Sequence, residues 1–343
     1  MTTRVTLFGV GRVARDVTRL LRARPDFSIV AAWSRNTGLI DKDLGEVAGG
    51  TPLGVTIVNN RAQALSVPAD IIVIATTSFL RDVAPDIQAG VEHNRNVICT
   101  AEEMAFPWLI DEAVAGELDQ LARRHGVTVL GGGVNPGFLS DALVLTAASA
   151  AWDVDHIVFK RAVNLSRFSA TILRRLGIGF SAGEFNAGTG GGTIFGHIGF
   201  PQSMHLVAHA LGERVEKITK RFEPILAERD YQLDQASVGR GLTAGFRQFS
   251  TAFVNGRPWF DAEFLGHLDP ESVGATLEDS VDIEGTVPVH LSIKPGLRAQ
   301  PASAALIANS LSRVVEAPPG LLTVADLRPA RPSPTLKSAL AAG

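Results

Sequence analysis

The first 150 residues alternate between short apolar runs and longer amphipathic stretches. The apolar runs are rich in β-branched residues and lack in/out alternation, whereas the stretches between them repeat their apolar positions at helical spacing. The predicted strands are 4–8, 27–33, 55–58, 69–76, 96–100 and 127–130. The predicted helices are 13–24, 61–65, 81–90 and 107–124. Continuous apolar strands separated by helices indicate a parallel sheet that is covered on both faces.

After about residue 150 the strands become longer and alternate between apolar and polar positions. The predicted strands are 154–163, 215–222, 246–254, 257–265, 280–283 and 287–293. Asn255-Gly256 separates two of them and is a strong hairpin signal, and Glu284-Gly285 marks a second hairpin. The pattern therefore predicts an antiparallel sheet, followed by a helix at 302–315.

These patterns predict an α/β fold class. We expect a Rossmann-type, doubly wound parallel sheet plus a second α+β domain with a mainly antiparallel sheet. The length of 343 residues fits two domains. We place the first domain at 1–150, with 300–330 returning to it, and the second domain at 151–299.

The overall composition narrows the function classes. A formal net charge of −3 gives no electrostatic footprint for nucleic acid or an anionic membrane. Cys99 is the single cysteine, so neither an intrachain disulfide nor a cysteine-rich metal site is expected. His205 and His209 have metal-ligand spacing but lack the glutamate of an HExxH motif, so no metal is expected. An early charge at Arg4 argues against a signal peptide, and no apolar run reaches membrane-spanning length, so we expect a soluble cytoplasmic enzyme.

A glycine motif at 9–14 links the first predicted strand to the first predicted helix, as a dinucleotide-binding fingerprint requires. Gly9 permits the tight turn, Gly11 lets the backbone approach the pyrophosphate, and the small Ala14 replaces the third glycine. Arg12 and Val13 open the helix, whose free N–H groups and positive dipole end would face the phosphates. The alternative is a glycine-rich turn without a ligand.

The residues after the second predicted strand bear on the choice of cofactor. An NAD site usually has Asp or Glu there, which accepts a hydrogen bond from the ribose 2′-OH. This chain has Ser34, Arg35 and Asn36 instead, and Asp26 lies before the strand. Arg35 can pair with a 2′-phosphate, with hydrogen bonds from its two neighbours, although a solvated surface arginine would give the same pattern. We predict that NADP(H) is the preferred cofactor and that NAD(H) is tolerated.

Further strand ends should face the nicotinamide, because ligands of open parallel sheets bind beyond the carboxyl ends of the strands. These ends carry Thr76 and Thr77, Glu102 and Glu103, and Asn135 and Pro136. A carboxylate can stabilise a cationic iminium and move protons between ammonium and water. In an extended segment only one glutamate of the pair would enter the site. Alternatively, the pair simply begins a helix supported by Pro107.

Four segments carry a family resemblance that touches both predicted domains, namely 98–107, 133–138, 195–201 and 315–321. They resemble the 2,4-diaminopentanoate dehydrogenase family, which includes native amine dehydrogenases and has an N-terminal domain similar to dihydrodipicolinate reductase. The resemblance implies NAD(P)-dependent deamination of amines, or amination of carbonyls with ammonia. It also implies an essential glutamate in the Glu-Glu pair and a homodimer built through the sheet of the second domain. Glu103 is favoured because it falls where related folds such as homoserine dehydrogenase carry a lysine, and Glu102 stays open.

Substrate contacts are expected mainly from the second domain. The stretch 183–199 carries seven glycines and is predicted to be a mobile loop that closes over the substrate, the alternative being a flexible surface connection. His197 accompanies residues that suggest a small apolar pocket, namely Phe138, Phe168, Ile172, Phe195 and Phe200. In diamino-acid users of the family, Arg161 and Asn164, joined by His267, would hold a substrate carboxylate. Arg161 could equally form a structural ion pair.

The leading hypothesis is an NAD(P)H-dependent amine dehydrogenase. It would aminate a ketone or an aldehyde with ammonia, and in reverse it would deaminate a primary amine or a diamino acid similar to 2,4-diaminopentanoate. One alternative is a reductase of a preformed cyclic imine or carbonyl, as in dihydrodipicolinate or homoserine metabolism. The other is a non-catalytic NADP-sensing protein.

Overall fold

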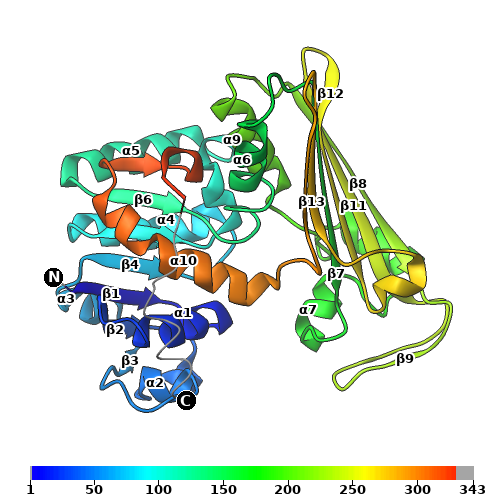
Figure 1. Ribbon diagram of the computed structural model, residues 1–343. Coiled ribbons are helices and arrows are strands. Elements are labelled where there is room, and N and C mark those ends of the chain that lie inside the picture. The colour runs from blue at the N-terminus through cyan, green and yellow to red at the C-terminus, as the bar shows by residue number, and fades with distance from the viewer. Residues whose placement is uncertain (1, 330–343) are drawn as a thin grey trace. The chain divides into compact units, whose positions relative to one another are not determined.

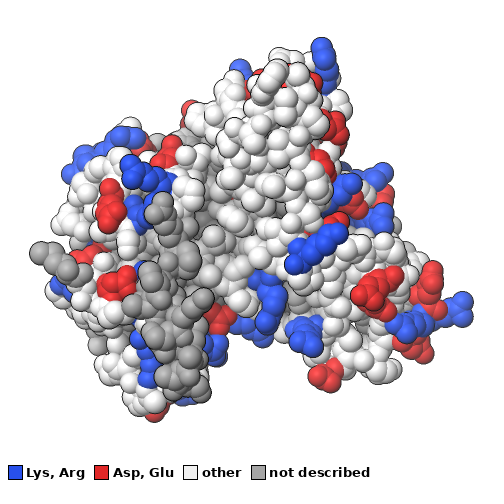
Figure 2. All heavy atoms as spheres, viewed as in Figure 1, with Lys and Arg blue, Asp and Glu red and all other residues white. Residues whose placement is uncertain are grey.

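The computed structural model describes residues 2–329 and divides into two compact units (Figure 1). Among the described residues, the first unit comprises 2–141 and 298–329, and the second comprises Ala142–Leu297. Within residues 2–329, no helix combines the length and the hydropathy that crossing a membrane would require. On the face shown in Figure 2, basic and acidic side chains are interspersed.

The first unit is built on a seven-stranded parallel sheet with the order β15-β6-β5-β4-β1-β2-β3. Its strands are β1 (Thr3–Phe8), β2 (Phe27–Trp33), β3 (Ile57–Val58), β4 (Ile71–Ile74), β5 (Asn96–Cys99), β6 (Thr128–Gly131) and β15 (Gly320–Leu322). The strand order reverses between β1 and β4, and such a switch point is where open α/β sheets bind ligands. The edge strand β15 was not predicted, because three residues beside Pro318-Pro319 give too short an apolar pattern.

Helices cover both faces of this sheet. They are α1 (Arg12–Arg22), α2 (Leu44–Val47), α3 (Arg61–Ser66), α4 (Leu80–Glu92), α5 (Glu112–His125) and α10 (Ala299–Glu316). Neighbouring residues of β4 enter opposite cores: Ile71 packs with α1 and α10, whereas Ile72 packs with α3, α4 and α5. Every residue of β4 is therefore buried, which explains the continuous apolar run in the sequence. The predicted helix at 107–124 is wrong at its start, because Asp111 caps α5 through a hydrogen bond from the Val114 N–H.

The second unit is built on a six-stranded sheet with the order β14-β13-β7-β12-β11-β8. Its strands are β7 (His156–Asn164), β8 (Lys217–Leu226), β11 (Thr243–Val254), β12 (Arg257–His267), β13 (Asp279–Glu284) and β14 (Val289–Ile293), and β9 (Tyr231–Gln232) pairs separately with β10 (Ser237–Val238). Only the β7–β12 pair of the six-stranded sheet is parallel. Asn255 and Gly256 both have positive φ, 51° and 73°, as a tight hairpin turn requires. The predicted fold class is confirmed.

The helices of the second unit are α6 (Ala142–Ala148), α7 (Ala170–Arg175), α8 (Ala182–Gly190) and α9 (Phe200–Ala210). The prediction of a loop across 183–199 is wrong for its first half, which forms α8. Ser181 and Glu184 make a reciprocal capping box at the start of α8, and Phe185 is fully buried beneath it. Capping and burial together outweigh the low helix propensity of the glycines.

Candidate active site

The turn between β1 and α1 has the geometry of a phosphate cradle. Gly9 has a φ of +89°, and a Cβ there would lie 2.4 Å from the Ala75 carbonyl oxygen, so only glycine fits. Gly11 is the N-cap residue of α1, and no side chain among the described residues accepts a hydrogen bond from the first N–H groups of the helix. A Cβ on Gly11 would meet nothing within 4 Å. Arg12 and Val13 form the first turn of α1. The uncapped helix start and the open space before it fit the pyrophosphate of a dinucleotide.

Ser34, Arg35 and Asn36 form a turn directly after β2. Ser34 is buried, and its Oγ accepts a hydrogen bond from the Asn36 N–H at 3.1 Å. The Asn36 Oδ1 accepts from the Gly38 N–H, and Arg35 is exposed. The structure therefore brings the three predicted residues together at the carboxyl end of β2.

Arg61, the first residue of α3, lies beside this turn and was missed by the sequence analysis. Its guanidinium lies 5.6 Å from the centroid of the Trp33 ring and forms an ion pair with Asp86 of α4, with 2.6 Å between Nη2 and Oδ1. A signal was available in the sequence. A basic residue in the first turn of a helix opposes the helix dipole, so its presence there indicates a negative partner nearby.

The segment after β4 lies at the neighbouring strand end. The Thr76 Oγ1 is buried and has no hydrogen-bond partner among residues 2–329. Thr77 Oγ1 donates to Asp82 Oδ2 at 3.3 Å. A buried hydroxyl without a protein partner at the switch point fits a site whose ligand supplies that partner.

Glu103 contacts the start of α4. The Leu80 N–H donates to Glu103 Oε2 at 2.6 Å, and the Glu103 N–H donates to the Ser78 carbonyl at 3.2 Å. Glu102 and Glu103 are both half-buried and begin a short 3-10 helix, Glu102–Ala105. The expectation of an extended segment is therefore wrong, and the helix-start alternative is present in the structure. This helix start does not exclude a catalytic role, because the Glu103 carboxylate is still fixed beside the carboxyl ends of β4 and β5.

The loop after β6 holds Asn135 and Pro136 in a fixed backbone. The Gly137 N–H donates to Asp141 Oδ2 at 2.6 Å, and the Asn135 Oδ1 accepts from the Ser140 hydroxyl. Gly137 has a φ of +118°, and a Cβ on it would lie 2.2 Å from the Gly133 nitrogen. Phe138, which follows, is half-buried and belongs to the first unit.

The polar residues predicted to hold a carboxylate each have an internal partner in the second unit. Arg161 is 4% exposed, with Nη1 at 2.5 Å from Asp279 Oδ1 and Nη2 donating to the Leu297 carbonyl at 2.8 Å. Burial lowers the pKa of Arg161 and raises the pKa of Asp279, so desolvation opposes both charges and their contact offsets it. The Asn164 Oδ1 accepts a hydrogen bond from a backbone N–H two residues later. The His267 ring is buried and hydrogen-bonds to the Asp269 backbone. The structural ion pair that the sequence left open is present.

His197 is fixed by a clamp on its backbone. The Gln248 Oε1 accepts from the His197 N–H at 2.6 Å, and the Gln248 Nε2 donates to the His197 carbonyl at 2.7 Å. The ring lies edge-on to Phe200, with 4.5 Å between centroids, and its Nε2 is buried without a partner among the described residues. Burial, with a smaller effect from the Arg161 charge, lowers the pKa of His197 to about 3, so the imidazole is neutral at physiological pH.

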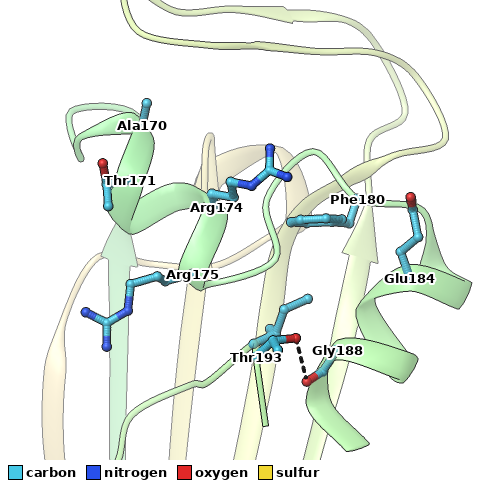
Figure 3. Close-up of a pocket in the computed structure, with 9 residues that line it drawn as sticks. Ala170, Thr171, Arg174, Arg175, Phe180, Glu184, Gly188 and Thr193 are labelled. Atoms are coloured by element: carbon cyan, nitrogen blue, oxygen red, sulfur yellow. Dashed lines mark hydrogen bonds between the residues drawn. The ribbon is translucent and has the colours of Figure 1, made fainter. Parts of the chain in front are cut away.

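The second unit also contains a separate pocket of about 580 Å³ (Figure 3). Its lining includes Arg174 and Glu184, which reach it from α7 and α8 on either side of the Phe180 ring. None of the predicted substrate residues lines it. Phe168 packs instead on the core of the unit, Ile172 is half-buried, and Phe195 lies beneath Arg175 at 5.7 Å. Within residues 2–329, no group of three or more potential ligands could hold a metal ion.

Comparisons with known proteins cover both units. The family model of the 2,4-diaminopentanoate dehydrogenase C-terminal domain matches residues 138–336, and that of the dihydrodipicolinate reductase N-terminus matches residues 3–101. The chain is 30% identical to a 2,4-diaminopentanoate dehydrogenase of Acetoanaerobium sticklandii, over 94% of this chain and 93% of the relative. It is 42% identical to a 4-hydroxy-tetrahydrodipicolinate reductase of Anaeromyxobacter dehalogenans, over 31% of this chain and 35% of the relative.

Among solved structures, an amine dehydrogenase from Mycobacterium smegmatis superposes with a TM-score of 0.85 and 25% identity, over 97% of this chain and 98% of that chain. The match to the reductase model ends at residue 101, whereas the likeness to the dehydrogenases spans both units. The resemblance noted in the sequence is therefore confirmed. The chain belongs to the 2,4-diaminopentanoate dehydrogenase family and is an NAD(P)-dependent oxidoreductase acting on CH–NH2 groups.

Proposed function

We propose that the chain catalyses the reversible reductive amination of a ketone or an aldehyde with ammonia, with NADPH as the reductant. The placement of Glu103 carries this proposal: its Oε2 accepts the Leu80 N–H at the start of α4, beside the carboxyl ends of β4 and β5. A helix N-terminus favours a neighbouring negative charge. The contact uses one carboxylate oxygen and leaves Oε1 for the reaction.

Glu103 accounts for the proton steps. Ammonia adds to the carbonyl carbon to form a carbinolamine, and the carboxylate moves a proton to the hydroxyl that leaves as water. Its negative charge then stabilises the iminium. Bound NADPH supplies the hydride that reduces the iminium carbon. In sum, a carbonyl, an ammonium ion, NADPH and one proton give a protonated amine, NADP⁺ and water.

The turn after β2 supports NADP(H) as the preferred cofactor, with NAD(H) tolerated. Arg35 is exposed at the carboxyl end of β2, where the 2′ position of the adenosine ribose is bound in this fold. The Ser34 Oγ accepts the Asn36 N–H, so its hydroxyl hydrogen stays available to a phosphate. No carboxylate occupies these three positions to accept from a ribose 2′-OH.

We further propose that the substrate is an uncharged carbonyl compound, although the relative from Acetoanaerobium sticklandii is named for a diamino acid. The Arg161 charge is compensated by Asp279, and His197 is neutral. A substrate carboxylate would therefore have to displace a buried ion pair. An uncharged ketone would not have to displace this ion pair.

The sheet of the second unit is proposed to form a homodimer. Glu263 of β12 is flanked by Lys160 of β7, its register partner, and by Arg247 of β11, 4.0 Å away. Mixed charges of this kind can pair with themselves across a two-fold axis. Light scattering should give twice the chain mass of 36.3 kDa, and a monomer mass would contradict the proposal.

Ammonia dependence tests the proposed reaction. NADPH oxidation with butanone should require ammonium and should yield 2-aminobutane, detected by mass spectrometry. An equal rate of oxidation without ammonium would contradict the proposal and favour the carbonyl or imine reductase. No turnover across a panel of carbonyls with ammonium would contradict the proposed carbonyl substrates.

A further inference from the structure

Two arginines and a buried carboxylate gather near the end of β2 in the first unit. Arg61 has 40% of its side chain exposed, lies over the Trp33 ring and contacts Asp86. Trp33 is itself fixed, because its Nε1 donates to the Asn59 carbonyl at 2.9 Å. Arg35 follows Trp33 by two residues. The guanidinium of Arg61 is therefore held from below by a ring and from one side by a carboxylate.

Asp86 lies in the middle of α4 with 6% of its side chain exposed. Burial raises its pKa, whereas the charges of Arg61 and Arg35 both lower it. A single buried carboxylate thus lies within electrostatic reach of both arginines, one from the turn after β2 and the other from the start of α3. The two positive charges together exceed the one negative charge that they share.

The position of Arg61 is unfavourable for its own helix. As the first residue of α3 it faces the positive end of the helix dipole, and Asn60 already caps that helix through the Gln63 N–H. The helix therefore gains nothing from an arginine at this position. An ion pair with one exposed member, such as Arg61–Asp86, is also weak evidence for stability.

We propose that Arg61 and Arg35 form a two-arginine clamp for the 2′-phosphate of NADP(H), and that Asp86 is the positioning residue that holds Arg61 over Trp33. This inference rests on the proposed use of NADP(H). Asp86 Oδ1 lies 2.6 Å from Nη2 of Arg61 as an ion pair, and the other N–H groups of the planar guanidinium are left for phosphate oxygens. The excess positive charge suits a phosphate dianion and has no role toward a ribose hydroxyl.

Binding of 2′,5′-ADP and 5′-ADP to the full chain, measured by calorimetry, tests the clamp without any turnover. The wild-type chain should bind 2′,5′-ADP at least tenfold more tightly. Arg61→Gln should reduce that preference by about 10-fold or more, because hydrogen bonds to charged groups contribute about 1.5–3 kcal/mol, and it should leave 5′-ADP binding unchanged. Arg81→Gln is the matched control, since Arg81 is a 79% exposed arginine of α4 that should leave both affinities unchanged.

Asp86→Asn tests the positioning role. It should reduce the preference less than Arg61→Gln does, and adding it to Arg61→Gln should cause no further loss. The double variant also guards against misfolding, because it removes both members of the ion pair. If the ion pair were merely structural, its loss would instead weaken the binding of both ligands equally.

The possible failures can be told apart. If the wild-type chain binds 2′,5′-ADP and 5′-ADP with equal affinity, the NADP(H) proposal and the clamp are both contradicted. A strong wild-type preference that survives Arg61→Gln would overturn the clamp alone and leave NADP(H) use standing.

Discussion

The two units differ in how they present polar groups. In the first unit they lie at strand ends and at helix starts, as with the uncapped start of α1, the exposed Arg35 and the Thr76 hydroxyl, which has no partner among the described residues. In the second unit the charged groups at the predicted carboxylate-binding position are buried and paired, as in the Arg161–Asp279 ion pair. Removing a group from the first unit should therefore weaken ligand binding and leave the fold intact. Removing one from the second unit should destabilise the fold.

Arg161→Met should give the largest effect on stability. It leaves Asp279 buried without its cation, which costs about 3–5 kcal/mol of unfolding free energy in comparable buried pairs. Arg161→Met combined with Asp279→Leu should recover most of the loss, because it removes the unpaired charge. Urea unfolding measures both variants. A loss below about 1 kcal/mol, together with a raised KM for 4-oxopentanoate, would instead make Arg161 a substrate-binding residue.

Arg35→Gln tests the opposite side of the comparison. The KM for NADPH should rise about 10- to 100-fold, and the KM for NADH should change little. The free energy of unfolding should stay within about 0.5 kcal/mol of wild type. Steady-state kinetics with both cofactors provides the readout. A clear preference for NADH that survives the substitution would remove Arg35 from the account.

His197 should give a smaller effect that depends on pH. Its folded pKa of about 3 lies below the unfolded value of about 6.5, so the unfolded chain binds a proton that the folded chain does not. This contribution to stability is complete above about pH 6.5 and is lost as the pH falls toward 3. At pH 5 the free energy of unfolding should have lost at most about 2 kcal/mol of this contribution.

The comparison of His197→Gln with wild type isolates this contribution. Urea unfolding at pH 7.5 and pH 5 should show a smaller drop for His197→Gln than for wild type. His93→Gln, which changes an exposed histidine, should keep the wild-type drop. Equal drops in all three proteins would mean that His197 does not stay neutral in the fold.

The same contrast explains what could be predicted from the sequence. Gly9 and Gly11 have roles set by the strand and the helix beside them, so spacing alone identifies the phosphate cradle. The helix α8 escaped prediction because a local capping box and the burial of Phe185 compete with glycines, and composition does not rank these effects. The Arg161–Asp279 pair joins residues 118 positions apart, and Gln248 lies 51 positions from His197. The first pair follows from the register of β7 with β13 and the second from the packing of a loop on β11, and neither follows from a local pattern.

Arg61 and Glu103 lie between these extremes. Each residue was visible as a charge at a helix start, yet its partner belongs to α4 in both cases. The sequence pointed to the Glu-Glu pair through its place at a predicted strand end and through the family resemblance. The contact with the Leu80 N–H is what distinguishes Glu103 from Glu102 in the structure.

The kinetics of Glu103→Gln and Glu102→Gln test the central claim most directly. The Gln amide oxygen can still accept the Leu80 N–H, so the start of α4 keeps its contact while the negative charge is lost. With butanone, ammonium and NADPH, Glu103→Gln should lower kcat by at least about 100-fold, whereas Glu102→Gln should stay within about threefold of wild type. A Glu103→Gln enzyme that aminates butanone at a near wild-type rate would contradict the account.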